Sequence, residues 1–321
     1  MKILNLNNKD EVKRVNDFLN SCPYHDCMQT INWLLFKPSD EKFGVYIEDE
    51  NNNIILYSNI FIINKNGVKK LYTSRGPICD YSNYDLINKF IKEITDITNI
   101  DYLVMDPRIF EFDFDKCIGS PKIINHLDYF SQQYSSQNAI ITLTNMDDLL
   151  NSFHSKTRYN IRQSIKKDVY YKVVKRIDID KFYELYLDTA YRHEFKPHNK
   201  EYFINLLEIY KDDLVLCEVR CDDVVVCIGI YLIDRDKLYY LYGVSVRQFQ
   251  DRMPSYAQHF KTMEYAYNIG LKYYDFGGVF CSGDDVTNGD YGLYKFKLGF
   301  CREFVNYIGE IEFDLKSLRG Q

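Results

Sequence analysis

One order of secondary structure elements occurs twice in this chain of 321 residues, and it constrains the fold more than any other feature. In each half, three short strand-like runs precede a helix with apolar residues at helical spacing, and a fourth strand-like run follows. The elements lie at 43–48, 54–63, 69–73, 84–97 and 100–106, and again at 214–219, 224–233, 238–244, 254–269 and 272–276. Corresponding elements are about 170 residues apart. The pattern therefore predicts two similar domains in tandem.

Three antiparallel strands, a helix and a further strand are the core order of the GNAT acyltransferase fold, which both halves resemble. We therefore expect an α/β (α+β) chain with two tandem GNAT-like domains. The last strand, near 303–315, should return to complete the first domain. The predicted domains are residues 1–138 with 308–321, and residues 139–307.

The turn that would bind an acyl-CoA donor has an unusual composition. In a GNAT fold, backbone N–H groups of a glycine-rich turn hold the pyrophosphate of coenzyme A. The corresponding turn of the second half, residues 246–253, has no glycine and carries Asp251. In the first half, Gly76 is followed by Pro77, which has no N–H to donate. Neither turn suits coenzyme A.

Composition and patterning exclude several other classes of protein. The longest apolar stretch, 224–233, is ten residues, about half of what a membrane-spanning helix needs. The N-terminus turns polar after four residues, so we expect no secretion signal and a cytoplasmic location. Nine scattered cysteines indicate reduced thiols rather than a disulfide framework. The net charge of −6 argues against a polyanion-coated surface but permits one basic patch.

Six segments spread over nearly the whole chain together resemble the FemABX family, which transfers amino acids from aminoacyl-tRNA onto peptidoglycan precursors. The most specific are YDFGG at 274–278 and YGLYKFKLGF at 291–300. The others are a Gln, Trp and Lys pattern at 29, 33 and 37, YTSRGPICD at 72–80, a basic helix at 156–162 and an Arg and Phe segment at 189–195. Some members have a long helical arm in the second domain. This chain has no room for one between Lys167 and Asp178, so it is most similar to the compact members.

The resemblance implies a precursor-binding set of residues. It pairs Lys37 and Arg192 with the diphosphate of the precursor and adds Arg75 from the RGP segment; cations with several N–H donors suit a pyrophosphate. It also brings a tyrosine hydroxyl from the third strand of the second half to the precursor. Tyr240 and Tyr242 are two residues apart on that strand, so we expect them to share one face. Either could make the contact.

The resemblance also places Phe296 and Lys297 at the reaction centre, where the lysine stabilises the negative oxygen formed when an amine attacks the ester carbonyl. Losing one such donor costs about 2.7–4 kcal/mol, so Lys297→Met should slow turnover about 10²- to 10³-fold. The attacking amine must also lose a proton. Asp106 and Asp275 end equivalent strands and are candidates for the base, but aspartates at strand ends commonly bind backbone amides, and the base stays unassigned.

A predicted helix after Asn151 carries Arg158, Arg162 and Lys166 four residues apart, so their side chains share one face. A charged stripe is commonly a solvated surface. In an acidic chain it also fits contact with a local polyanion, here the phosphates of the tRNA.

Two groups of residues have the side chains of a zinc site without its spacing. They are Cys22, His25 and Cys27, and Cys217, Cys221 and Cys227. The first lacks a partner cluster, and the second lies in strand-like runs where cysteine is usually a small buried apolar group. We expect no metal. We also expect no cofactor, because the tRNA ester already carries the activation energy.

These observations favour an enzyme, an aminoacyltransferase that moves an amino acid from aminoacyl-tRNA to the stem-peptide amine of a peptidoglycan precursor and so builds the interpeptide bridge. The acceptor is UDP-MurNAc-pentapeptide or its lipid-linked form, and we expect a monomer with peripheral contact at the inner membrane face. Two alternatives stay open. One is a GNAT-type N-acyltransferase that uses a CoA thioester, which the glycine-free turn disfavours. The other is an inactive RNA- or precursor-binding relative, which Phe296 and Lys297 disfavour.

Overall fold

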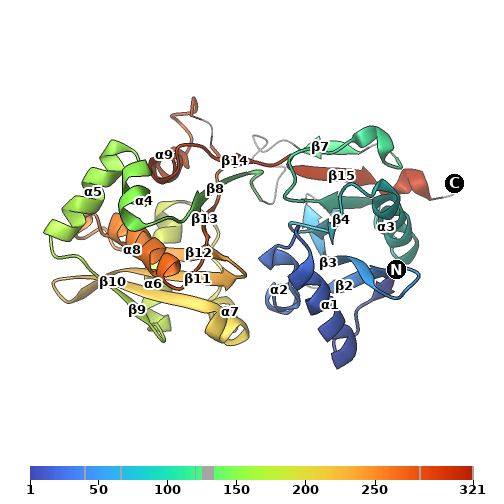
Figure 1. The fold of residues 1–321 in the computed structure, drawn as a ribbon, viewed down its shortest axis with the longest axis horizontal. Coiled ribbons are helices and arrows are strands. Elements are labelled where there is room, and N and C mark those ends of the chain that lie inside the picture. The colour runs from blue at the N-terminus through green and yellow to red at the C-terminus, as the bar shows by residue number, and fades with distance from the viewer. Residues whose placement is uncertain (40, 66, 120, 125–133, 282, 320–321) are drawn as a thin grey trace. The chain divides into compact units, whose positions relative to one another are not determined.

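The computed structural model of the chain describes residues 1–39, 41–65, 67–119, 121–124, 134–281 and 283–319. The chain divides into two compact units, each built on one mixed sheet (Figure 1). Unit 1 contains Met1–Gln137 and Asn306–Gln321, and unit 2 contains Asn138–Val305. Whether these units fold as the independent domains predicted from the sequence stays a prediction.

The sheet of unit 1 has the strand order β1-β2-β3-β4-β6-β15-β7, with β5 paired to β3. Strands β4 and β6 are parallel, and the other described pairs of this sheet are antiparallel. The last strand, β15, lies between β6 and β7, so the C-terminal segment completes this sheet. The strands are β1 Lys2–Ile3, β2 Lys42–Glu48, β3 Ile54–Lys65, β4 Val68–Thr73, β5 Ile78–Cys79, β6 Tyr102–Met105, β7 Lys122–Ile124 and β15 Glu310–Asp314.

The helices of unit 1 are α1 Lys9–Ser21, α2 Ile31–Phe36 and α3 Tyr84–Ile97. The apolar spacing predicted α3 with the bounds that the structure has. Asn83 caps its first turn by accepting a hydrogen bond from the Leu86 N–H at 3.1 Å. The face that carries Phe90 and Ile94 is fully buried in the core against the sheet.

The sheet of unit 2 has the strand order β14-β8-β13-β12-β11-β10-β9. As in unit 1, three antiparallel strands (β10, β11, β12) are followed by a helix (α8) and by a strand that pairs parallel to the third (β13). This confirms the predicted repeat. The strands are β8 Gln137–Thr142, β9 Tyr170–Val174, β10 Leu214–Cys221, β11 Val224–Asp234, β12 Lys237–Ser245, β13 Tyr273–Gly278 and β14 Val305–Asn306.

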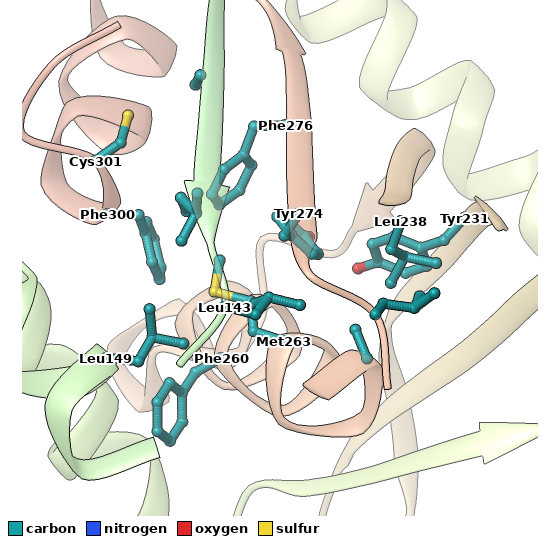
Figure 2. Packing of buried hydrophobic residues seen from close by; sticks show 14 of the residues in the cluster. Leu143, Leu149, Tyr231, Leu238, Phe260, Met263, Tyr274, Phe276, Phe300 and Cys301 are labelled. Atoms are coloured by element: carbon teal, nitrogen blue, oxygen red, sulfur yellow. The ribbon is translucent and has the colours of Figure 1, made fainter. Parts of the chain in front are cut away.

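The helices of unit 2 are α4 Met146–Ser152, α5 Ser155–Lys166, α6 Ile179–Arg192, α7 Lys200–Tyr210, α8 Pro254–Asn268 and α9 Tyr291–Phe300. Short 3-10 helices η1 to η5 lie at Cys27–Gln29, Phe114–Lys116, Lys211–Asp213, Gln250–Arg252 and Leu315–Leu318. Helix α8 begins with Pro254 in its first turn and is followed by Gly270 at φ +89°. Phe260 and Met263 of α8 pack in one core with Phe276 of β13 and Phe300 of α9 (Figure 2). This core fixes α8, β13 and α9 against one another.

Within the described residues, no helix is long and apolar enough to cross a membrane.

Candidate active site

Lys297 lies in the last turn of α9 and is almost fully buried, at 5% exposure. Its Nζ donates a hydrogen bond of 2.7 Å to the carbonyl of Gly278 at the end of β13. Burial lowers the pKa of the Lys297 ammonium from 10.5 to about 8, although Asp275 acts in the opposite direction. The hydrogen bond to Gly278 therefore holds the Lys297 side chain in place, while burial makes its charged form less stable than that of an exposed lysine.

Asp275 holds the turn that positions this lysine. It is fully buried, and its Oδ1 accepts hydrogen bonds from the Gly277 N–H at 2.8 Å and from the Asn138 side chain at 3.3 Å. Gly277 has φ +82°, a conformation that favours glycine. The carbonyl of the next residue, Gly278, accepts the Lys297 bond. Asp275, one of the two aspartates predicted as candidates for the base, therefore binds a backbone amide, as strand-end aspartates commonly do.

His259 of α8 lies next to Lys297, and the sequence reasoning missed it. Its Nδ1 is 2.6 Å from the Tyr274 hydroxyl, and its ring centroid is 4.6 Å from that of Phe276 and 5.4 Å from that of Phe296. Burial, followed by the positive charge of Lys297, lowers the pKa of His259 to about 3. The imidazole is therefore neutral at neutral pH. The signal available in the sequence was an ionisable residue directly before Phe260, which belongs to the apolar stripe of this helix.

Phe296 lines a hollow of about 230 Å³ at the N-terminal end of α8, together with Tyr256, Ser245 and Gln250. Its ring packs against Tyr256, with the centroids 5.0 Å apart. One of the residues that line the hollow, Phe296, directly precedes Lys297 in the chain. The hollow lies at the N-terminal end of α8, which is the end of the helix where GNAT folds bind their donors.

The turn before α8 differs from a phosphate-binding loop. Phe249 and Met253 have positive φ values of 65° and 59° without being glycines. Both terminal nitrogens of Arg252 bind the carboxylate of Asp222, at 2.7 and 2.6 Å. The turn thus combines bulky side chains with an arginine that is already paired.

Arg192 ends α6 and reaches the rim of this hollow. Its Nε donates to Asp188 at 2.9 Å, and its Nη2 donates to the hydroxyl of Thr189 at 3.0 Å and to the carbonyl of Ser245 at 2.9 Å. The guanidinium is therefore fixed by three bonds beside a lining residue of the hollow. Guanidinium carries five N–H donors, so donors on Nη1 are left for an anion.

The prediction that Tyr240 and Tyr242 share one face of β12 is wrong. The register of β11 and β12 shifts between Ile230 and Tyr231, because Ile230 pairs with Tyr242 and Tyr231 pairs with Tyr240. Such a bulge adds one residue and reverses the alternation of side chains. Tyr240 packs against His259 of α8, at 4.8 Å between ring centroids.

Tyr242, by contrast, packs against α6 and α7. Its ring lies 5.1 Å from Phe203, and its hydroxyl is 2.6 Å from the Tyr202 hydroxyl. His198 stacks on Tyr202 at 3.9 Å between ring centroids. The two predicted tyrosines therefore have different surroundings: Tyr240 lies near His259 and Phe276, and Tyr242 lies in the aromatic cluster of α6 and α7.

In unit 1, Lys37 directly follows α2, with its Nζ 5.5 Å from the ring centroid of Trp33. The residue is half-buried, and burial lowers the pKa of its ammonium to about 8. The preceding Gln29 ties this segment to the RGP segment, because its Nε2 donates to Thr73 at 3.1 Å and to the Ser74 carbonyl at 2.5 Å. A Cβ on Gly76 would lie 2.5 Å from the Gln29 side chain, so only glycine fits there.

Arg75 is buried rather than presented to solvent, since its side chain is 2% exposed. Its Nη1 donates to Asp106 at 3.1 Å, and its Nη2 donates to the Ser135 carbonyl at 3.0 Å. The Tyr72 hydroxyl lies 3.1 Å from Glu310 and 3.3 Å from Asp106. Burial raises the pKa of Asp106 to about 7, with Arg75 opposing and Glu310 reinforcing the rise. The second base candidate thus lies in a buried ionic network.

The predicted basic helix is confirmed as α5, with the side chains of Thr157, Ile161 and Ser164 buried. Arg158 is half-buried and donates to the carbonyl of Phe153 at 2.5 Å. Arg162 and Lys166 are exposed. No three His, Cys, Asp or Glu side chains of the described chain form a group that could hold a metal ion.

Comparison with known proteins shows the family to which the chain belongs. The sequence model of the FemAB family matches residues 11–222, about two thirds of the chain. The chain belongs to the FemAB family. A model described as an acetyltransferase (GNAT) domain matches residues 155–297 of this FemAB-family protein.

Two curated relatives cover most of the chain. A protein of Weissella viridescens named UDP-N-acetylmuramoylpentapeptide-lysine N(6)-alanyltransferase is 25% identical, over 97% of this chain and 96% of its own. A protein of Staphylococcus epidermidis named aminoacyltransferase FemB is 23% identical, over 82% of this chain and 83% of its own.

Among solved structures, the crystal structure of FemX has a TM-score of 0.80 and 20% identity, and all of both chains is covered. A tandem GNAT protein from the clavulanic acid biosynthesis pathway has a TM-score of 0.54 and 10% identity, over 98% of this chain and 97% of its own. The predicted fold class, α/β with two tandem GNAT-like domains, is confirmed.

Proposed function

We propose that this FemAB-family protein is an aminoacyltransferase that moves an amino acid from aminoacyl-tRNA to the stem-peptide amine of a peptidoglycan precursor, in the cytoplasm. The observation that carries the proposal is Lys297, a buried lysine bonded to a backbone carbonyl; its chain neighbour Phe296 lines a hollow at the start of α8. Fully burying a charged ammonium is unfavourable unless it has a function or a partner charge. The names of the two curated relatives support the reaction class.

Lys297 would act on the negative oxygen of the tetrahedral intermediate. The amine attacks the ester carbonyl of the charged tRNA, a C–N bond forms, and the carbonyl oxygen becomes an oxyanion. An ammonium has three N–H donors, and one of them is bonded to Gly278. The remaining donors would stabilise the oxyanion, and collapse of the intermediate would then expel the tRNA hydroxyl. Phe296 would shape the hollow that receives the ester.

The surroundings of Lys297 suit this role. Neutral His259 and the rings of Phe276 and Phe296 exclude water, which strengthens the attraction between an ammonium and an oxyanion. Neither Asp275 nor Asp106 faces an open site, because both are buried in bonds within their own units. We therefore propose that no side-chain carboxylate of these two takes the proton from the attacking amine.

Precursor binding is proposed for Lys37, Arg192 and Tyr242. Arg192 is held by three bonds and keeps donors for a phosphate, and the hydroxyl of Tyr242 lies in the aromatic cluster of α6 and α7. Arg75 is proposed to act indirectly, through the buried network that shapes its segment. The name of the Weissella relative favours a nucleotide-linked pentapeptide with an acceptor lysine.

One experiment tests the reaction class and the donor together. Purified protein is mixed with total charged tRNA and a nucleotide-linked pentapeptide, and the product is weighed by mass spectrometry. A gain of one amino acid residue is expected, and RNase treatment of the tRNA should abolish it. A parallel reaction with acetyl-CoA covers the second candidate, which the turn at 246–253 disfavours because it has no glycine and a paired arginine. Acetylation there, with no gain from charged tRNA, would contradict the proposal.

A further inference from the structure

The most cationic stretch of the chain covers α5 and β9. Between residues 154 and 176 there are eight lysines and arginines and one acidic residue, a net charge of +7. The whole chain has a net charge of −6, so the remaining residues have −13. The cations are Lys156, Arg158, Arg162, Lys166, Lys167, Lys172, Lys175 and Arg176. The charge of the protein is therefore strongly separated along its sequence.

Most of these cations have no acidic partner in the part of the chain that the structure describes. Lys167 forms an ion pair with Asp251 at 3.2 Å. Among the described residues, no carboxylate lies within ion-pairing distance of the other seven. Six of the seven are exposed, with the half-buried Arg158 as the exception. Elsewhere in unit 2, Arg220 and Arg252 do have carboxylate partners. The positive charge of this stretch is thus directed to solvent without local neutralisation.

Helix α5 gathers four of the cations on its exposed side. Thr157, Asn160, Ile161 and Ser164 are buried on the other side. We call Lys156, Arg158, Arg162 and Lys166 the basic face of α5. At a rise of 1.5 Å per residue, the ten steps from Lys156 to Lys166 extend over about 15 Å, which is long enough to meet several phosphates of a nucleic acid strand.

The charge pattern of α5 suits the dipole of the helix only at its C-terminal end, where Lys166 lies in the last turn. The helix has no acidic residue, and Lys156 lies in its first turn, where the helix dipole disfavours a cation. Helices α1, α3, α4, α6 and α7 instead have acidic residues in their first turns. The helix dipole therefore does not account for Lys156 or Arg162, and an external anion would.

Exposed aromatic rings accompany the basic face. Tyr159 is 51% exposed, with the Nζ of Lys156 at 5.3 Å from its ring centroid, and Tyr170 is 64% exposed. Cations for phosphates together with rings for unpaired bases are the features of a single-strand nucleic acid surface. A membrane-bound helix would instead bury an apolar face in the lipid, whereas this exposed side has Ile165 as its aliphatic residue. The observations favour RNA.

We propose that the basic face of α5, with Tyr159, binds the sugar-phosphate backbone of the donor tRNA. The inference rests on the proposed function, because it takes RNA as the carrier of the amino acid. Binding of this kind is electrostatic and independent of the base sequence. It would hold the tRNA while the charged end enters the hollow beside Phe296.

The test compares two double variants that each remove two exposed lysine or arginine charges. Arg162→Gln with Lys166→Gln changes the basic face, and Lys89→Gln with Lys92→Gln changes the exposed side of α3 as the matched control. Glutamine keeps helix propensity, so both variants should fold, as circular dichroism would confirm. Binding of uncharged tRNA is measured by fluorescence anisotropy from 50 to 300 mM salt. For the first variant, the slope of log K against log salt should flatten by about 1.4–1.8. The control should keep the wild-type slope.

The outcomes of these measurements either support the proposal or overturn it. A wild-type slope in the first variant, or equal flattening in the control, would overturn it. Loss of binding to vesicles with anionic lipid, while tRNA binding is unchanged, would overturn it in favour of a membrane. A higher KM for charged tRNA at unchanged kcat and unchanged precursor affinity would support it. Normal tRNA binding without any transfer would refute the proposed function, whereas transfer with an unchanged salt slope would refute this inference alone.

Discussion

Replacing Lys297 by methionine should separate activity from stability. The pKa of the lysine falls from 10.5 to about 8 in the folded chain, chiefly through burial. A tenfold change in an equilibrium constant is worth about 1.4 kcal/mol, so at pH 7 the charged form costs the fold about 3 kcal/mol. Methionine has similar length and no charge, and it removes this cost.

The lost bond partly offsets the gain. Without Lys297, the Gly278 carbonyl loses its donor, which costs about 1–3 kcal/mol. Lys297→Met should therefore unfold at the same free energy as the wild type or up to about 2 kcal/mol higher. Its transfer rate should fall about 10²- to 10³-fold, because the oxyanion loses a preorganised donor.

The pH dependence gives the sign of the effect independently. The pKa of Lys297 is depressed in the folded state, so its penalty is complete below pH 8, shrinks between pH 8 and 10.5, and is absent above. The advantage of Lys297→Met over wild type should shrink as the pH rises from 7 to 9.5. Urea unfolding followed by circular dichroism measures it, beside the mass-spectrometric transfer assay. A variant that loses more than about 1 kcal/mol while it keeps its activity would refute the reasoning, because Lys297 would then be structural.

Three further predictions concern other residues. Because burial lowers the pKa of Lys37 to about 8, precursor affinity measured by calorimetry should weaken from pH 7 to 9, and Lys37→Met should show no such change. Asp275→Asn should move the alkaline limit of the transfer rate to lower pH, since the charge of Asp275 raises the pKa of Lys297; an unmoved pH profile would contradict this. Gly243→Ala should destabilise unit 2 by about 1–3 kcal/mol in urea, because its Cβ would lie 1.9 Å from the Tyr240 hydroxyl.

The sequence predicted regular elements well wherever periodicity and caps agree. Helix α3 has the predicted bounds because its apolar face, its Asn83 cap and the polar residues after it all indicate the same limits. The repeat was visible for a similar reason, since β10, β11 and β12 are three apolar runs separated by short turns. Local rules suffice when every level of the pattern agrees.

The same rules failed where tertiary structure intervenes. A bulge opposite Tyr231 reverses the alternation of side chains along β12, and the residues around Leu241 do not predict it. Arg75 appeared in the sequence as a charge for a ligand, whereas the fold pairs it with Asp106, which is 31 residues away. The burial of Lys297 and its contact with His259 arise from the packing of α8 against α9, which spacing along the chain does not encode.

The bond network around Gln29 has a consequence for how such proteins are recognised. Gln29, Thr73 and Gly76 form one tightly packed contact inside unit 1, with no space left for a larger residue at position 76. A homologue that had lost its catalytic activity would still need this packed contact in order to fold. Genome searches that rely on the N-terminal signatures would therefore report folded copies, and under the proposed function the residue equivalent to Lys297 would distinguish the active copies from the inactive ones.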